Sequence, residues 1–342
     1  MRSIIVGLIS AIALAAPAHA GPVADARGLK VVGHIPGPDG HWDYASFDPE
    51  RRRVYVSHGD EVLALGVDSG ILNVSFAPGD HLHAIVAVPH ADVLVTTNSG
   101  DNSVRILRAS SGALLKSLSV APDADGAAFD PATGLVMVIN GEPGLVTLID
   151  PIAQSVDGTI KVGDALEFGA VDGRGRAFVN IESTGEVAVL DLVHRRVLTR
   201  YKLDGCQRPT GLAYVEGRRV ISACANNVAK VLDARTGQQI ASLKIGPHPD
   251  SVLVDPVRHR AFVPTGGDGM LSVIALTGSE NDKVIAVIPT HVGARTGAVD
   301  PKTGCIYLPT AEFGPPSAPG QRLAILPASF QILVVGNAPA RH

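Results

Sequence analysis

The chain alternates short apolar runs with short polar stretches rich in glycine, proline and aspartate. The pattern is clearest between Gly126 and Val162, where it predicts four strands, at residues 126–129, 135–140, 145–150 and 156–162. The stretch Asp-Pro-Ala-Thr-Gly at 130–134 separates the first two strands. Proline presets φ for a tight turn, and glycine accepts the positive φ that closes a hairpin. We therefore predict a four-stranded antiparallel unit, and the sequence shows no amphipathic helical pattern.

This unit recurs along the chain. Seven copies align on the residue pair at the end of the first strand, which reads Phe47-Asp48, Val88-Pro89, Phe129-Asp130, Val171-Asp172, Val215-Glu216, Val254-Asp255 and Val299-Asp300. Short strands with a turn every 8–12 residues are typical of sandwiches, barrels and propellers. Only a propeller explains a period of about 40 residues. The predicted fold is an all-β, seven-bladed β-propeller of four-stranded blades.

The two ends of the chain are expected to meet in the last blade. Residues 29–35 resemble the outer strand of other units, so we expect the N-terminal strand to join that blade and close the ring. Residues 306–309 and 323–326 are predicted as its second and third strands. Residues 330–335 then either take the outer place or extend the third strand, and the sequence leaves both arrangements open.

Composition agrees with this fold. Hydrophobic residues make up 46% of the chain, and its 37 glycines and 24 prolines suit frequent turns. The formal net charge is −4, without a run of Lys or Arg. A mildly acidic chain of this kind offers no electrostatic footprint for nucleic acid or for an anionic membrane.

The first twenty residues resemble a secretory signal. Arg2 precedes an apolar stretch at 4–15, and Ala18-His19-Ala20 matches a small-x-small cleavage site. A membrane anchor is the alternative, but the apolar run is shorter than the roughly 20 residues that a span requires. We expect residues 1–20 to be a signal peptide and residues 21–342 to be one propeller domain in the periplasm or secreted, without a membrane span.

Three cysteines leave at least one unpaired. Cys206 and Cys224 flank one predicted hairpin, at the end opposite its turn, where their Cα atoms can come within bridging distance. We predict a disulfide between them, with two buried thiols as the alternative. Cys305 is expected to be a distant, buried residue.

The units resemble the YVTN-family β-propeller repeat. Its second strand is matched most closely by Tyr55-Val56-Ser57-His58 and by Val95-Thr96-Thr97-Asn98. The stretch from Val228 to Gly246 matches the rest of the repeat, and the resemblance extends from about Leu29 to Val335. It implies a propeller scaffold, similar to exported binding proteins, but it implies no particular ligand.

A functional site is expected at the axis, because loops held by a rigid scaffold carry function disproportionately. The loops that lead into the inner strands, and those between second and third strands, are polar and emerge on one face. The candidate binding residues on this axial face are His41, Asp43, His81, His83, Glu167, Arg208, Asp250, Arg295 and Glu312. These side chains either converge on a ligand or only bind water and one another.

Several chemistries remain open at this face. His41, His83 and His248 are weak candidates for ligands of a divalent metal, since imidazole and carboxylate groups suit Zn²⁺ or Cu²⁺; no other cofactor is indicated. Arg208 and Arg295 either clamp an anion together or pair with neighbouring glutamates. Trp42, the sole tryptophan, is either a stacking platform or a packing residue between the first two blades.

The sequence contains no G-x-S-x-G, H-E-x-x-H, P-loop or C-x-x-C motif. Our leading interpretation is a monomeric binding scaffold that captures a small molecule, an ion or a protein segment at the axial face. The first alternative is a hydrolase or lyase similar to lactonase-type propellers, with Glu167, His248 and Asp250 as acid, base or metal ligands. The second is a cell-surface interaction module that uses the blade rims. Carboxyl pKa values raised by burial would favour the enzyme.

Overall fold

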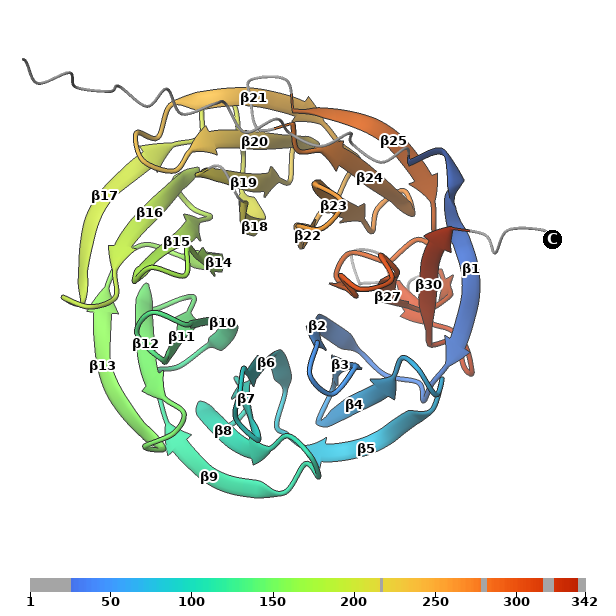
Figure 1. Cartoon of the computed structure of the whole chain (residues 1–342), viewed down its shortest axis with the longest axis horizontal. Helices are drawn as coiled ribbons and strands as arrows, with labels where there is room; N and C mark the ends of the chain where they lie inside the picture. Colours follow the sequence, from blue (N-terminus) through green and yellow to red (C-terminus); the bar gives the residue numbers. More distant parts are fainter. Residues whose placement is uncertain (1–25, 216–217, 278–281, 316–322, 338–342) are drawn as a thin grey trace, which may run out of the picture.

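The computed structural model describes residues 26–215, 218–277, 282–315 and 323–337. Seven four-stranded antiparallel sheets surround one central axis, and each forms a blade whose first strand is innermost (Figure 1). The predicted all-β, seven-bladed propeller is confirmed. The expected signal peptide, residues 1–20, lies outside the described residues.

Each of blades 1 to 6 is a meander of consecutive hairpins. Blade 1 contains β2 (Trp42–Asp48), β3 (Arg53–His58), β4 (Glu61–Gly66) and β5 (Leu72–Pro78). Blade 2 contains β6 (Leu82–Val88), β7 (Val93–Asn98), β8 (Ser103–Arg108) and β9 (Leu114–Ser119). Blade 3 contains β10 (Ala124–Asp130), β11 (Leu135–Asn140), β12 (Leu145–Asp150) and β13 (Ser155–Lys161).

The next three blades repeat this order. Blade 4 contains β14 (Leu166–Val171), β15 (Arg176–Ile181), β16 (Glu186–Asp191) and β17 (Arg196–Lys202). Blade 5 contains β18 (Pro209–Val215), β19 (Arg219–Cys224), β20 (Val228–Asp233) and β21 (Gln239–Lys244). Blade 6 contains β22 (Leu253–Asp255), β23 (Arg260–Thr265), β24 (Met270–Ala275) and β25 (Lys283–Pro289).

Blade 7 joins both ends of the chain. Its strands, from the axis outward, are β26 (Ala298–Val299), β27 (Ile306–Thr310), β30 (Gln331–Asn337) and β1 (Leu29–Pro36). The N-terminal strand, blue in Figure 1, lies beside β30 in red, so the predicted closure is confirmed. A 3₁₀ turn, η1 (Ala26–Gly28), precedes it.

The third strand of blade 7 differs from the prediction. Residues 331–337 form it, whereas the segment expected there supplies only β29 (Ala324–Ile325), which pairs with β28 (Phe313–Gly314) in a separate hairpin. The burial of the two segments gives the reason. Ile332, Leu333 and Val335 are fully buried, whereas Leu323 and Leu326 are 49% and 39% exposed. The more apolar segment therefore takes the place between two packed strands.

The core lies between the blades. The faces of neighbouring sheets pack against each other, and blades 3 and 4 bury Met137 and Ile139 of β11 with Leu166 and Val179. All six residues of β7 are buried for the same reason. Second strands therefore read as continuous apolar runs rather than as alternating patterns, because both of their faces are covered.

On the face opposite the axial face, aspartates at the ends of the inner strands hold the turns in place. Asp130 accepts hydrogen bonds from the backbone and hydroxyl of Thr133 at 3.0 and 2.9 Å, which closes the turn predicted at 130–134. The equivalent Asp300 of blade 7 is fully buried and pairs with Arg52 of blade 1 at 2.6 Å. These turn aspartates thus join blades 1 and 7 as well as closing hairpins.

Cys206 and Cys224 form a disulfide in blade 5, with their Cα atoms 5.5 Å apart. Cys305 lies in blade 7 and is only half-buried, which corrects the expectation of a fully buried thiol. No helix within the described ranges is long and apolar enough to cross a membrane.

The disulfide is expected to contribute modestly to stability. It links residues only 18 positions apart, so replacing both cysteines with serine should lower the free energy of unfolding by about 3 kcal/mol or less. Denaturant titration of the Cys206→Ser/Cys224→Ser variant measures this loss, with Cys305→Ser as the control. A variant that does not fold at all would show that blade 5 depends on the bridge far more than its short loop implies.

Candidate functional site

The axial site is built from one equivalent position of each blade. In blade 1 this position is Asp43, which directly follows Trp42, the residue paired with His58 at the start of the first hairpin. Five residues further on, the inner strand ends at Asp48. The equivalent residues around the axis are Asp43, His83, Asp125, Glu167, Thr210, Asp250 and Arg295. We call these seven residues the axial ring.

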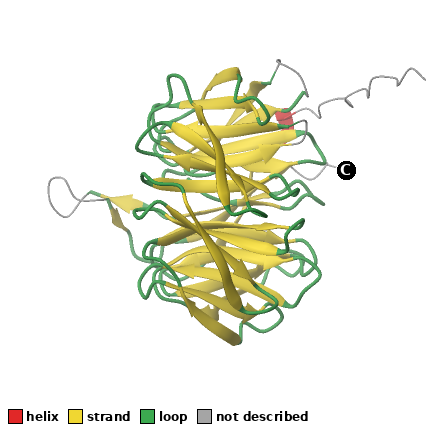
Figure 2. Cartoon of the chain, turned by 90° about the vertical axis from the view of Figure 1, so that its left-hand side faces the viewer, coloured by secondary structure: helices red, strands yellow, loops and turns green. Residues whose placement is uncertain are grey.

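The axial ring opens into a cavity of about 940 Å³. Six ring residues line it, Thr210 being the exception, and His41, His81 and His248 also contribute. The β28–β29 hairpin stands out from the axial face in Figure 2, and its Phe313, Leu323 and Ile325 form an apolar part of the wall. The cavity has the size of a site for a small molecule.

Hydrogen bonds between neighbouring blades hold the ring residues in place. Thr97 of blade 2 donates to the carbonyl of Asp125 at 2.6 Å, and Thr296 of blade 7 donates to that of Asp43 at the same distance. Ser251 of blade 6 donates to the carbonyl of Arg295 at 3.3 Å. The backbone of each of these ring residues is thus fixed by the adjacent blade.

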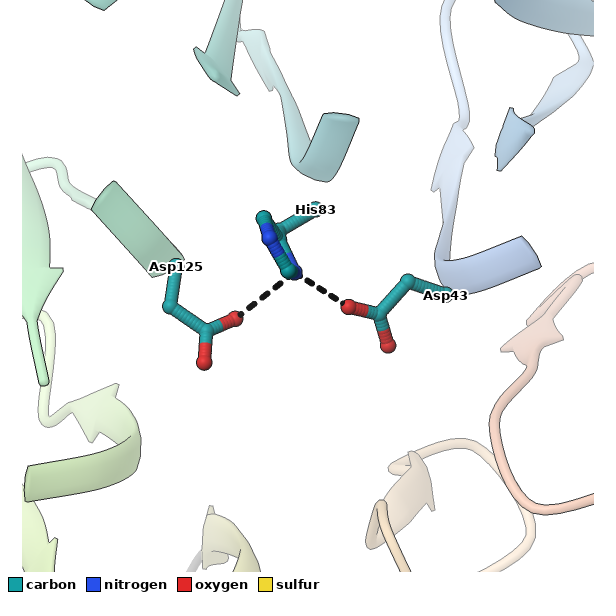
Figure 3. A group of neighbouring side chains, drawn as sticks. All are labelled: Asp43, His83 and Asp125. Atoms are coloured by element: carbon teal, nitrogen blue, oxygen red, sulfur yellow. Dashed lines mark hydrogen bonds and ion pairs between the residues drawn. The ribbon is translucent and has the colours of Figure 1, made fainter. Parts of the chain in front are cut away.

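Asp43, His83 and Asp125 meet on one side of the cavity (Figure 3). Nδ1 of His83 lies 2.6 Å from Asp43 Oδ2 and 3.4 Å from Asp125 Oδ1. Burial opposes a positive charge on His83, but the hydrogen bond to Asp43 and the charge of Asp125 together raise the pKa of its imidazole. The carboxylates beside it therefore favour the protonated form of this histidine.

Asp250 and Arg295 form an ion pair on another side. Arg295 Nε donates to Asp250 Oδ2 at 2.7 Å, and Nη2 donates to the carbonyl of Trp42 at 3.2 Å. Burial raises the pKa of Asp250 to about 6, although Arg295 acts in the opposite direction. Arg295 is the one guanidinium among the described residues that line the cavity.

The remaining ring carboxyls are held in an environment that disfavours their charge. Burial, followed by repulsion from Asp125 and Asp250, raises the pKa of Glu167 to about 9. Burial, followed by repulsion from Asp43, raises the pKa of Asp125 to about 7. Burial and these same carboxylates raise the pKa of the Tyr44 hydroxyl as well. The cavity therefore crowds together more carboxyl groups than its own basic groups pair with, and this crowding disfavours their ionisation.

Two of the predicted site residues, Arg208 and Glu312, do not line the cavity. Arg208 does not line it: its side chain is 74% exposed and pairs with Glu182 at 2.7 Å. Glu312 also lies outside the lining, at the base of the β28–β29 hairpin, where its backbone bonds Leu326 and Ser329. The anion clamp suggested for Arg208 and Arg295 is therefore not formed. Arg208 pairs with a neighbouring glutamate, as the alternative held, whereas Arg295 pairs with Asp250 instead of a glutamate.

Backbone conformation alone does not displace Arg208. It lies two positions before the ring residue Thr210 and has φ of 49°, like the equivalent His81 and His248, whose φ values are 50° and 53°. Positive φ is uncommon for residues other than glycine. The two histidines line the cavity, so the ion pair with Glu182 is what distinguishes Arg208 from them.

Trp42 packs between blades 7 and 1 rather than between blades 1 and 2. Its side chain is 6% exposed, and its ring centroid lies 5.5 Å from that of Phe330 and 6.1 Å from that of Phe313. Of the two roles weighed for it, the packing role fits the structure. The same residue also forms part of the cavity wall, so it can report on a bound molecule.

Three cavity residues with polar side chains were absent from the predicted site: Tyr44, Asp60 and Asp125. Asp125 could have been found by counting. In blades 1, 3, 4, 6 and 7 the ring residue lies five positions before an aspartate that ends or directly follows the inner strand, at 48, 130, 172, 255 and 300. Tyr44 follows a ring residue, and nothing in the sequence distinguishes it from a core tyrosine.

The raised pKa of Glu167 predicts a pH-dependent stability. The folded chain keeps this proton up to pH of about 9, whereas the unfolded chain releases it near 4.5, so stability should fall as pH rises between these values. One such group contributes at most about 1.4 kcal/mol per pH unit, and less where solvent reaches it. Glu167→Gln should flatten the slope, measured by denaturant titration at several pH values. The exposed Glu142→Gln is the control, and equal slopes in all three proteins would contradict the prediction.

Comparisons with known proteins identify the fold. No family model matches the sequence, and no curated protein is similar to it. Among solved structures, the chain resembles the RRP9 WD40 repeats with a TM-score of 0.76 at 13% identity, over 91% of this chain and 98% of that one. U3-55K gives 0.75 at 12% identity, over 90% and 99%. A chain of hydrazine synthase from Kuenenia stuttgartiensis gives 0.70 at 14% identity, over 80% and 92%. The chain is thus a seven-bladed β-propeller with the architecture of WD40-type propellers.

Proposed function

We propose that this protein is a binding scaffold that captures a small cation, organic or metallic, in its axial cavity. The observation that carries the proposal is the composition of the axial ring. Four blades each supply a carboxyl group, Asp43, Asp125, Glu167 and Asp250, against one guanidinium and one imidazole. Crowded, largely buried carboxylates repel one another, and a bound cation removes this repulsion.

An exported location fits the proposal. Residues 1–20 have the pattern of a signal peptide, and a structural disulfide such as Cys206–Cys224 persists in an oxidising compartment. The resemblance of the repeats to the YVTN family points in the same direction. We therefore propose that the mature chain, residues 21–342, functions in the periplasm or outside the cell.

A calorimetric titration tests the proposal. The mature protein is titrated with a diamine, a quaternary ammonium ion, Mg²⁺ and Zn²⁺, and with inorganic phosphate and a dicarboxylate for comparison. At least one cation should bind with one site per chain and perturb the fluorescence of Trp42, the single tryptophan, which forms part of the cavity wall. Binding of the anions alone would overturn the proposal.

A second candidate function is a hydrolase or lyase that uses the same carboxyls. The raised pKa of Glu167, about 9, favours it, because a carboxyl that is protonated at neutral pH can act as a general acid. Glu167 and Asp250 line the cavity together with His248, as that interpretation requires. Turnover of lactone or ester substrates that is lost in Glu167→Gln, while cation binding persists, would favour the enzyme.

A further inference from the structure

The side chains of Asp43, His83 and Asp125 come from the inner strands of three consecutive blades, β2, β6 and β10, and point toward one another (Figure 3). One ligand atom from each of the three lies within 4.8 Å of the other two. Atoms that coordinate one tetrahedral ion at about 2.0–2.2 Å lie about 3.3–3.6 Å from one another. The three ligand atoms therefore have to approach one another by at most about 1.5 Å, a shift that side-chain rotations can supply.

Hydrogen bonding prepares His83 for coordination through Nδ1. Its Nε2 lies 2.9 Å from Ser99 Oγ, and this hydroxyl itself donates to the carbonyl of His81 at 3.4 Å. Ser99 therefore accepts the proton of Nε2. An outer hydrogen bond of this kind fixes the tautomer and the ring orientation of a metal-binding histidine. Nδ1 is left facing two carboxylates, where either a second proton or a metal ion can lie.

Asp125 adds an independent observation. Its Oδ1, the oxygen that faces His83, is buried and accepts no hydrogen bond from any described residue. A buried carboxylate oxygen without a hydrogen-bond donor costs free energy, so such atoms usually have a ligand or water as partner. The three blades thus present an oriented imidazole nitrogen, an unsatisfied carboxylate oxygen and a second carboxylate at one point of the cavity wall.

We propose that Asp43, His83 and Asp125 bind one divalent transition-metal ion, with Zn²⁺ the best match to one nitrogen and two oxygen ligands. The inference rests on the proposed function, since it names the cation that the axial ring holds. Three protein ligands leave a fourth position of a tetrahedral ion open. That position faces the cavity of about 940 Å³, which leaves room for a metal-bound small molecule. His41 and His248 line the same cavity but lie outside the group of three.

The test uses the full mature chain, freed of metal by a chelator. Titration with ZnCl₂ should give one tight site per chain, and Co²⁺ in its place should give the visible absorption spectrum of a tetrahedral nitrogen–oxygen site. His83→Ala and Asp125→Asn should abolish the tight site. Ser99→Ala should weaken it by about 10–100-fold, as loss of an outer hydrogen bond does. His194→Ala, which removes an exposed histidine that pairs with Asp191 away from the cavity, is the matched control and should bind like the wild type.

Thermal unfolding of each metal-free variant confirms that it is folded before its affinity is compared. Equal Zn²⁺ binding by the wild type and His83→Ala would show adventitious sites and overturn the metal centre, as would loss of the tight site in His194→Ala. If Zn²⁺ fails to bind but an organic cation binds and perturbs Trp42, only the metal centre is wrong. If no cation binds, the proposed function fails with it.

Discussion

Replacing both Asp43 and Asp250 with asparagine is expected to weaken cation binding by about 100-fold or more. Each carboxylate that pairs with a charged ligand group contributes about 1.5–3 kcal/mol, and about 1.4 kcal/mol corresponds to a tenfold change in affinity. The two residues belong to blades 1 and 6 and line the same axial cavity. Calorimetric titration with the cation that binds the wild type measures the loss.

The control is a pair of carboxylates away from the cavity. Asp101 and Asp157 form surface ion pairs with Arg105 and Arg195, so the Asp101→Asn/Asp157→Asn variant loses the same formal charge without altering the ring. Arg295→Gln tests the sign of the effect, because removal of the cavity's guanidinium should strengthen cation binding. Equal losses in the ring and surface variants would mean that only the overall charge matters.

Removal of the N-terminal strand is expected to have the largest effect on stability. A chain that begins at residue 38 lacks β1, which pairs with β30 from Leu29↔Asn337 to Pro36↔Gln331. Leu29, Val31 and Ile35 pack into the cores on either side of blade 7. Each buried apolar side chain contributes about 1.5–3 kcal/mol, so the loss is comparable to the roughly 5–15 kcal/mol that stabilises a typical domain.

We expect the truncated chain to aggregate or to unfold without a cooperative transition, because the edge of β30 is left unpaired. Circular dichroism during heating, together with gel filtration, tests this. Two point variants test whether the packing of β1, rather than the mere presence of these residues, stabilises the ring. Leu29→Lys changes a side chain that is 7% exposed and should be strongly destabilised. Val32→Lys changes a side chain that is 42% exposed and should be close to the wild type in stability. A truncated chain that melts like the full one would show that β1 does not close the ring.

The fold could be predicted because the repeat determines it. Turn signals between apolar runs fix the strands, and seven copies of one unit fix the number of blades. Prediction was wrong where the repeat is interrupted, in blade 7. There the long connection between β27 and β30 contains its own hairpin, and apolar residues 323–326 resemble a strand although they lie at the surface.

The site could be predicted only in part, since its position depends on strand register. In blade 1 the pairing shifts between Trp42 and Ala45, which turns Asp43 toward the axis. Polar loops reveal that the axial face is unusual, but they do not show which residue of each loop points inward. The predicted site therefore contained Arg208, whereas the ring residue of blade 5 is Thr210. The ion pairs of the arginines depend on contacts between blades, which a single repeat does not contain.

The most direct test of the cation site is a crystal structure of the mature protein soaked with the cation that calorimetry selects. The account predicts difference density for that cation in the axial cavity, in contact with carboxylates of the ring from at least two blades among Asp43, Asp125, Glu167 and Asp250. Density at the blade rims or on the opposite face, with the axial cavity containing only water, would contradict it.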